Sequence, residues 1–173
     1  MNHKMFDTSF HIAKNGIPYT LVIIDVQHGY TAAENDNLLT NLLKQIKKAK
    51  EDDAAILLVN MDLAGTKSIS CIWNAVYDYT YFAQVIKYDT DGSSEIIDAL
   101  KKYRFLNKNK FKVGGVYSNI CVTDTVNGLD RKLPEAEIEV LAKCCYTDYT
   151  DCGLAPIESP FDRIKSKQVE IIF

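Results

Sequence analysis

The chain has 173 residues, of which 47% are hydrophobic and 25% charged, and its formal net charge at pH 7 is −3. These values are typical of one globular domain with a substantial core, so we expect a single domain over residues 1–173. They exclude a basic nucleic-acid footprint, and no apolar stretch approaches the ~20 residues that cross a bilayer. The five cysteines are unevenly spaced, and the first residues lack the apolar centre of a signal peptide. Both features favour the reducing cytoplasm.

The first half of the chain alternates strands with helix-length segments. The apolar run over residues 21–24 predicts a strand buried on both faces, as in a parallel sheet. Residues 37–50 form an amphipathic helix with lysines toward its end, which suits the helix dipole. A second buried strand is predicted over 54–60, a partly helical and aromatic-rich segment over 68–81, and a third strand that ends at Lys87.

The second half continues the same alternation. Its predicted elements, helix and strand in turn, are residues 93–103, 111–115, 119–131, 138–142, 157–165 and 168–173. Strands separated by helices imply right-handed crossovers and a largely parallel sheet. We therefore expect an α/β fold, a Rossmann-like three-layer α/β/α sandwich whose mostly parallel sheet has about six strands.

The segment GGVYSNICVTDT, residues 114–125, is the most informative stretch of the chain. Its apolar start and paired glycines predict a strand that ends in a tight turn, and Ser118 and Asn119 are good N-cap residues for a following helix. Cys121 then lies in the first turn of that helix, where orphan N–H groups and the helix dipole favour a nucleophilic thiolate. The alternative is that Cys121 is a small buried hydrophobe.

Asp25 and Lys87 each end a short apolar run. A carboxylate after a doubly buried strand costs free energy unless it has a partner, although one charge at a strand end is usually just solvated. Open α/β sheets carry their active sites at the carboxyl ends of their strands. A carboxylate, an ammonium and a thiol at such ends are the parts of a proton carrier, a charge partner and a nucleophile.

In these three places the chain resembles the isochorismatase-like cysteine hydrolases. LVIIDVQ, residues 21–27, is similar to their Asp-x-Gln opening, and GVYSNICV followed by Thr125 is similar to their motif Gly-Val-x-x-x-x-Cys-Val-x-x-Thr. Lys87 falls between the two, where that family carries its lysine. The resemblance covers roughly residues 20–148, and such enzymes include nicotinamidases, N-carbamoylsarcosine amidases, ureidoacrylate and maleamate amidohydrolases, and isochorismatase.

The resemblance implies a cysteine-dependent hydrolase of a small amide or ureido substrate that works through a thioester. Cys121 would attack the carbonyl carbon, Asp25 would carry the proton, and Lys87 would supply a positive charge. Backbone N–H groups of Tyr117 and Cys121 would form the oxyanion hole. In similar enzymes the peptide bond that corresponds to Val116–Tyr117 is cis.

Four side chains are candidates for substrate contact: Gln27, Tyr30, Trp73 and Tyr117. Aromatic side chains suit that role, because they combine an apolar body with a polar tip. For Trp73, a subunit contact and plain packing of a helix on the sheet are the alternatives.

The chain departs from the family in its metal ligands. Nicotinamidases bind a metal through an Asp and two His after the second strand, whereas here Asp62 is present and no histidine follows it in the sequence. We therefore expect no metal and no cofactor, which disfavours nicotinamidase activity.

Two other functions stay open. The fold could serve as a binding or interaction module without turnover, since fold alone does not give function. An isochorismatase-type vinyl ether hydrolase would need Asp25 and not the thiol. We expect a small-molecule substrate, no nucleic acid and no membrane, and the resemblance implies a homo-oligomer, a dimer or a tetramer.

Overall fold

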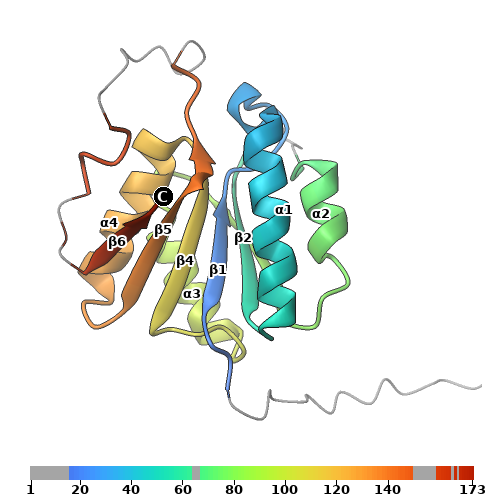
Figure 1. Cartoon of the computed structure of the whole chain (residues 1–173). Coiled ribbons are helices and arrows are strands. Elements are labelled where there is room, and N and C mark those ends of the chain that lie inside the picture. Colours follow the sequence, from blue (N-terminus) through green and yellow to red (C-terminus); the bar gives the residue numbers. More distant parts are fainter. Residues whose placement is uncertain (1–15, 64–66, 150–158, 165, 167) are drawn as a thin grey trace, which may run out of the picture.

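The computed structural model describes residues 16–63, 67–149, 159–164, 166 and 168–173. In these residues the centre of the molecule is a six-stranded sheet in the order β3-β2-β1-β4-β5-β6, and all neighbouring strands run parallel (Figure 1). The strands are β1 (Thr20–Ile24), β2 (Ala55–Met61), β3 (Phe82–Lys87), β4 (Lys110–Val116), β5 (Glu137–Tyr146) and β6 (Val169–Ile172). The predicted parallel sheet of about six strands is confirmed.

Helices cover both faces of the sheet and complete the predicted three-layer sandwich. One face carries α1 (Asp36–Glu51) and α2 (Ser70–Val76), and the other carries α3 (Ser93–Lys102) and α4 (Thr123–Lys132) (Figure 1). The short turns η1 (Thr31–Glu34) and η2 (Ser118–Val122) follow β1 and β4.

Strand β1 shows how the apolar sequence divides between two cores. Leu21 and Ile23 pack into the core beneath α1 and α2, whereas Val22 and Ile24 pack into the core beneath α3 and α4. This follows because successive side chains of a strand point to opposite faces. All of β1 is buried, so a central strand of this sheet must be apolar throughout, as the run over residues 21–24 predicted.

Two local predictions are wrong. Ser118 and Asn119 do not cap a helix, because the chain enters α4 through the π-helical turn η2, which has no side-chain cap, and the Asn119 side chain accepts a hydrogen bond from Thr147 at 2.9 Å. The helix predicted over residues 157–165 is not seen at 159–164, which form turns, and the rest of that range lies outside the described residues.

The register of the strands brings three chain segments to one edge of the sheet. Ile24 pairs with Val59 of β2 and with Gly115 of β4, and Met61 pairs with Lys87. Asp25, Lys87 and η2 therefore follow at the carboxyl ends of neighbouring strands. None of the helices in the described ranges is long and apolar enough to span a membrane.

Gly115 allows β1 and β4 to approach at this edge. Its φ is +139°, and a Cβ there would overlap the backbone of Ile24. We expect Gly115→Ala to lower the free energy of unfolding by on the order of 3 kcal/mol, since it combines a strained φ with a backbone clash. Urea denaturation followed by circular dichroism measures this loss.

Gly16 is the matched control. Its φ is also positive, at +76°, but a Cβ there would meet nothing within 4 Å. Gly16→Ala should therefore cost only about 1 kcal/mol. Equal losses for the two variants would contradict the close approach of the strands.

Candidate active site

A fully buried ion pair lies at the carboxyl edge of the sheet. The ammonium Nζ of Lys87 is 2.9 Å from Oδ2 of Asp25, and neither side chain is exposed. The carboxylate of Asp25 also interacts with the thiol of Cys121 and with the Met61 backbone. Two charges without water stabilise a site only when their geometry is fixed, because desolvation otherwise outweighs their attraction.

Cys121 is the third member of this cluster. It lies in η2, is 4% exposed, and its thiol interacts with both Asp25 and Lys87. The structure therefore brings together the three side chains that the sequence proposed as a nucleophile, a proton carrier and a charge partner. They come from three separate segments: the end of β1, the end of β3 and the turn after β4.

The thiol does not have the low pKa predicted from its position in the first helical turn. The pKa of Cys121 is raised to about 12, mainly by burial and then by the Asp25 carboxylate, while Lys87 opposes both. Desolvation and a like charge outweigh the helix terminus and the lysine here. The expectation of a resting thiolate is wrong: Cys121 is a thiol at neutral pH.

Asp25 is correspondingly a stronger base than an ordinary carboxylate. Burial raises its pKa above the usual range, although Lys87 and the neighbouring thiol lower it in part. A raised pKa favours acceptance of a proton and its later return.

A set of loop contacts fixes the position of Lys87. Its ammonium donates to the carbonyl oxygens of Asp89 at 2.8 Å and Thr90 at 3.4 Å. The Thr125 hydroxyl accepts a hydrogen bond from the Gly92 N–H at 2.9 Å and donates to the Thr90 carbonyl at 3.3 Å. Thr125 is one helical turn beyond Cys121, so it ties the lysine loop to the segment that carries the cysteine.

Gly92 provides the space for this arrangement. A Cβ at Gly92 would lie 2.8 Å from Cδ of Lys87. Sequence reasoning included Thr125 in the cysteine motif without giving it a role, and it did not single out Gly92. The short connection between β3 and α3 was the available signal, because a short loop must pass close to the side chain that precedes it.

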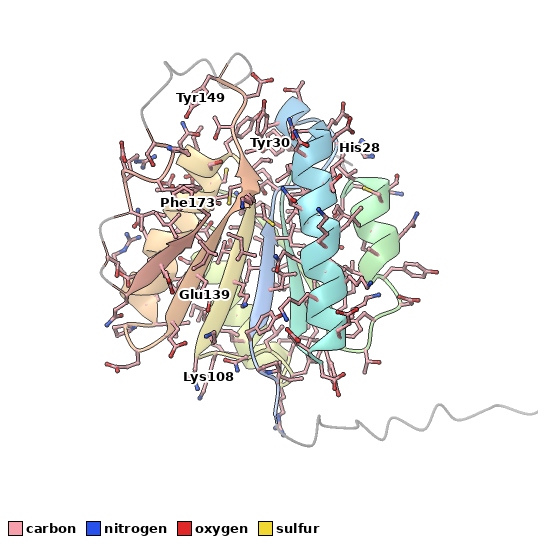
Figure 2. The ribbon with its side chains drawn as sticks, in the orientation of Figure 1. His28, Tyr30, Lys108, Glu139, Tyr149 and Phe173 are labelled. Atoms are coloured by element: carbon pink, nitrogen blue, oxygen red, sulfur yellow. The ribbon has the colours of Figure 1, made fainter. Side chains whose placement is uncertain are left out.

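Two of the four candidate substrate contacts lie beside the cluster. The rings of Tyr30 and Tyr117 meet edge to face at 5.4 Å, and the Val116–Tyr117 peptide bond is cis. Burial, together with the charges of Asp25 and Cys121, raises the pKa of Tyr30, which places its hydroxyl near both groups. Figure 2 shows Tyr30 at the upper edge of the sheet and Lys108 at the opposite edge.

The other two candidates have structural contacts instead. The Gln27 side chain donates to the Met61 carbonyl at 3.0 Å and accepts from the Met61 N–H at 2.8 Å, so it joins the ends of β1 and β2. Trp73 packs edge to face on Phe82 at 5.8 Å. Phe82 begins β3 and Lys87 ends it, a separation of about 16 Å along an extended strand. The structure thus places Trp73 beside the start of β3, in agreement with the packing alternative, and its contact with substrate stays a prediction.

The described residues contain no group of three or more His, Cys, Asp or Glu side chains placed to hold a metal ion. His28 is exposed, and its Nδ1 lies 3.9 Å from a carboxylate oxygen of Glu34. Two further histidines of the chain, His3 and His11, lie outside the described residues.

Comparison with known proteins identifies the fold. No protein-family model matches the chain, and no curated sequence matches it significantly. An isochorismatase family protein of known structure matches with a TM-score of 0.69 and 14% identity, over 90% of this chain and 98% of its own. A nicotinamidase from Staphylococcus aureus matches with a TM-score of 0.62 and 17% identity, over 74% and 82%.

A ribonuclease from Caenorhabditis elegans also matches, with a TM-score of 0.65 and 13% identity, over 84% of this chain and 71% of its own. The chain has the isochorismatase-like fold, in agreement with the resemblance of its motifs. Because a nicotinamidase and a ribonuclease both match this fold, the fold alone does not give the function, which must be argued from the site.

The raised pKa of Cys121 predicts how the thiols react with iodoacetamide. At pH 7 we expect Cys71, which is half-buried, to be alkylated before Cys121. Asp25→Asn removes the carboxylate that raises the Cys121 pKa, so alkylation of Cys121 should become at least about tenfold faster. Peptide mass spectrometry measures the rate at each cysteine, and circular dichroism verifies that the variant folds. Selective alkylation of Cys121 below pH 7 in the unmodified chain would contradict this picture.

Proposed function

We propose that the chain is a metal-independent hydrolase that cleaves a C–N bond of a small amide or ureido substrate through a thioester on Cys121. The observation that carries this proposal is the convergence of Cys121, Asp25 and Lys87 in one buried cluster, with the ion pair at 2.9 Å. The likeness in fold to a nicotinamidase and an isochorismatase family protein supports it.

The first step forms the thioester. Sγ of Cys121 attacks the substrate carbonyl carbon while Asp25 takes the thiol proton, so the carboxylate becomes a carboxylic acid. Asp25 then gives this proton to the leaving nitrogen as the C–N bond breaks, and ammonia or an amine departs. Because the thiol starts protonated, proton transfer and attack must be coupled.

The second step hydrolyses the thioester. Asp25, again a carboxylate, takes a proton from water, whose oxygen attacks the thioester carbon. The C–S bond breaks, and the proton on Asp25 returns to the sulfur as the acid product leaves. Lys87 stays charged throughout, so the cluster keeps one positive charge opposite the anion that is present at each stage.

The remaining parts of the site are proposed from position. The proposed donors to the oxyanion are the backbone N–H groups of Tyr117, which directly precedes η2, and of Cys121, which lies in η2. Tyr30 and Tyr117 would form aromatic walls beside the sulfur, which suits a small planar substrate. Gln27 would position the site indirectly, because its side chain joins the ends of β1 and β2.

The absence of a paired histidine motif after Asp62 in the sequence supports a reaction without a metal or cofactor. We also propose a cytoplasmic enzyme that acts on small molecules rather than on membranes or nucleic acid. A homo-oligomer is proposed too, because β3 is an edge strand of the sheet and its end exposes Ile86 and Tyr88, at 41% and 75%.

A second reaction is favoured by one observation, the raised pKa of Asp25. A carboxyl group with a raised pKa takes up a proton more readily, and in its protonated form it could protonate a vinyl ether, which is the first step of isochorismatase-type hydrolysis and does not need the thiol. A binding module without turnover remains the third possibility, since a buried thiol with a raised pKa is a slow nucleophile until Asp25 takes its proton.

Substitutions at the cluster separate these functions. We expect Cys121→Ala to lower kcat for amide hydrolysis by at least about 1,000-fold, and Asp25→Asn to do the same. Ammonia release from a panel of nicotinamide, maleamate, carbamoylsarcosine and ureidoacrylate measures the effect. Cys71→Ser, outside the cluster, is the control and should keep activity.

Other outcomes point to the alternatives. Hydrolysis of a vinyl ether that survives Cys121→Ala and fails with Asp25→Asn would support the second reaction. No turnover of any substrate by the unmodified chain would support the binding module.

Thr125 offers a test of how the lysine is held. Thr125→Val removes both hydrogen bonds to the loop, and we expect kcat to fall by about 10- to 100-fold while Thr125→Ser restores most of it. Lys87 lowers the pKa of Asp25, and a displaced Lys87 would do so less strongly. In the variant the Asp25 pKa should therefore be higher, and the acidic limb of the pH–rate profile should move to higher pH. A loss of kcat with an unshifted profile would mean that Thr125 only stabilises the fold.

A further inference from the structure

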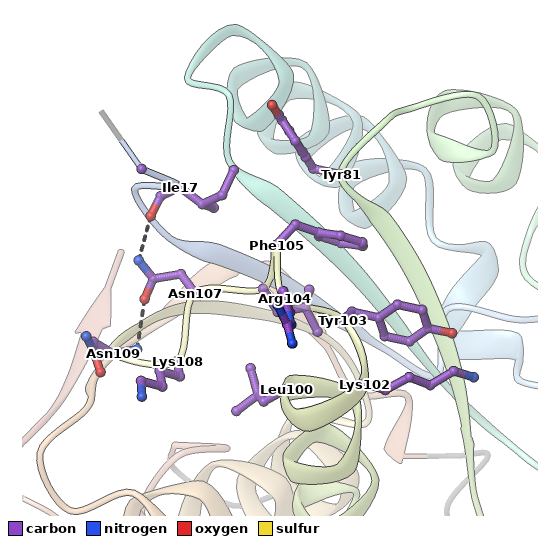
Figure 3. A pocket seen from close by; sticks show the side chains of 12 residues that line it. Ile17, Tyr81, Leu100, Lys102, Tyr103, Arg104, Phe105, Asn107, Lys108 and Asn109 are labelled. Carbon is purple, nitrogen blue, oxygen red and sulfur yellow. Dashed lines mark hydrogen bonds between the residues drawn. The ribbon is translucent and has the colours of Figure 1, made fainter. Parts of the chain in front are cut away.

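A cavity of about 820 Å³ lies at the edge of the sheet where the strands begin, opposite the Asp25–Lys87 pair (Figure 3). Most of its lining comes from residues 100–109, which end α3 and lead into β4. Tyr81, which directly precedes β3, and Ile17, which precedes β1, complete the wall. The cavity contains none of the residues proposed for hydrolysis, so its role is separate from that activity.

The wall of this cavity is held in place by one asparagine. Nδ2 of Asn107 donates to the Ile17 carbonyl at 2.6 Å, and its Oδ1 accepts from the N–H groups of Asn109 and Lys110 at 2.8 and 2.9 Å. The Thr20 hydroxyl donates to the Asn107 carbonyl at 2.9 Å. The loop is therefore anchored to the start of β1, and the cavity does not need a ligand to form.

Aromatic rings give the cavity an apolar surface. The Phe105 ring lies 6.2 Å from the Tyr81 ring and 5.7 Å from the Tyr103 ring, both tilted. Figure 3 shows the side chains of Phe105, Tyr81 and Tyr103 around the same opening. A planar ring fits such a surface, because offset and tilted contacts between rings are favourable.

The charged groups of the lining are all positive. They are Lys102, Arg104 and Lys108, and no carboxylate occurs among the lining residues that the structure describes. Lys102 already lies over the Tyr103 ring at 5.0 Å, in the last turn of α3, where a cation suits the helix dipole.

Arg104 and Lys108 differ from the neighbouring cations. Lys101 pairs with Asp98, and Lys110 pairs with Glu137, whereas Arg104 and Lys108 form no ion pair with any of the residues that the structure places. Two unpaired cations beside an apolar cavity, on a chain whose net charge is −3, provide charge complementarity for an anion.

We propose that this cavity binds an organic anion with a planar aromatic body. The ring would lie against Phe105 and its tyrosine neighbours, and the carboxylate or phosphate would bind Arg104 and Lys108. An arginine fork suits either oxyanion. The volume falls within the range of small-molecule sites, which are mostly apolar with a few placed polar groups.

The test uses the full chain and isothermal titration calorimetry. Adenosine 5′-monophosphate probes a phosphate source and benzoate a carboxylate source, while adenosine and benzyl alcohol are their neutral partners. We expect at least one anion to bind at least about tenfold more tightly than its neutral partner and than inorganic phosphate. Which of the two binds distinguishes the source.

Substitutions locate the binding. Arg104→Gln and Lys108→Gln should each weaken it about tenfold, as removal of one charged hydrogen-bond partner does. Lys101→Gln, in the same segment but paired with Asp98, is the matched control and should leave the affinity unchanged. Cys121→Ser should also leave the affinity unchanged, because the cluster of Cys121, Asp25 and Lys87 lies at the opposite ends of the strands.

The proposal is overturned if neither anion binds at millimolar concentration. It is also overturned if the neutral partners bind equally well, if inorganic phosphate alone accounts for the affinity, or if Lys101→Gln weakens binding as much as Arg104→Gln. Loss of binding in Cys121→Ser would mean that the anion occupies the catalytic cluster instead. These readouts do not depend on hydrolysis, so they stand apart from the failure or success of the proposed reaction.

Discussion

The buried ion pair between Lys87 and Asp25 is the constraint on which the carboxyl edge of the sheet depends. Neither charge reaches water, so neither tolerates displacement without a large desolvation cost. The surrounding features follow from this. Loop carbonyl oxygens accept hydrogen bonds from the ammonium, Thr125 anchors that loop, and Gly92 leaves room for the lysine stem. Gly115 lets the neighbouring strand approach closely enough to bring the cysteine turn alongside. Each of these serves the fixed geometry of two charges.

In the proposed reaction the same carboxylate would have opposite effects on Cys121 before and during the attack. At rest Asp25 adds to burial in keeping the thiol protonated. With a substrate carbonyl in place, Asp25 would accept that proton, because its raised pKa favours the protonated form. A buried thiol arranged in this way is protected from alkylation and oxidation, since only the thiolate is strongly nucleophilic. Its reactivity would depend on the substrate being bound, which a permanently ionised cysteine would not achieve.

The sequence predicted the fold and the meeting of the three side chains for one reason. Apolar runs that alternate with helix-length segments require a parallel sheet, and the ends of parallel strands share an edge. What it could not predict depends on contacts distant in the chain. The Cys121 pKa depends on how deeply other segments bury the sulfur, and the Gln27 amide is occupied by Met61 of the neighbouring strand. Trp73 looked like a pocket residue because it precedes Lys87 closely in sequence, yet β3 carries the chain away from it by its full length.

The strands run from the cavity, where they begin, to the Asp25–Lys87 ion pair, where they end. Strand β3 connects Tyr81 of the cavity with Lys87, and β1 connects the segment held by Asn107 with Asp25. A physical connection alone does not couple two sites, because coupling requires an element with two arrangements that both ligands bias. Strand β1 is buried on both faces and paired on both sides, so it leaves no room for a second arrangement. Strand β3 is the outermost strand on one side of the sheet and pairs with β2 alone. Its residues are more exposed than those of β1. Among these two strands, β3 has the fewer neighbours to hold it, and it is the one that ends at Lys87.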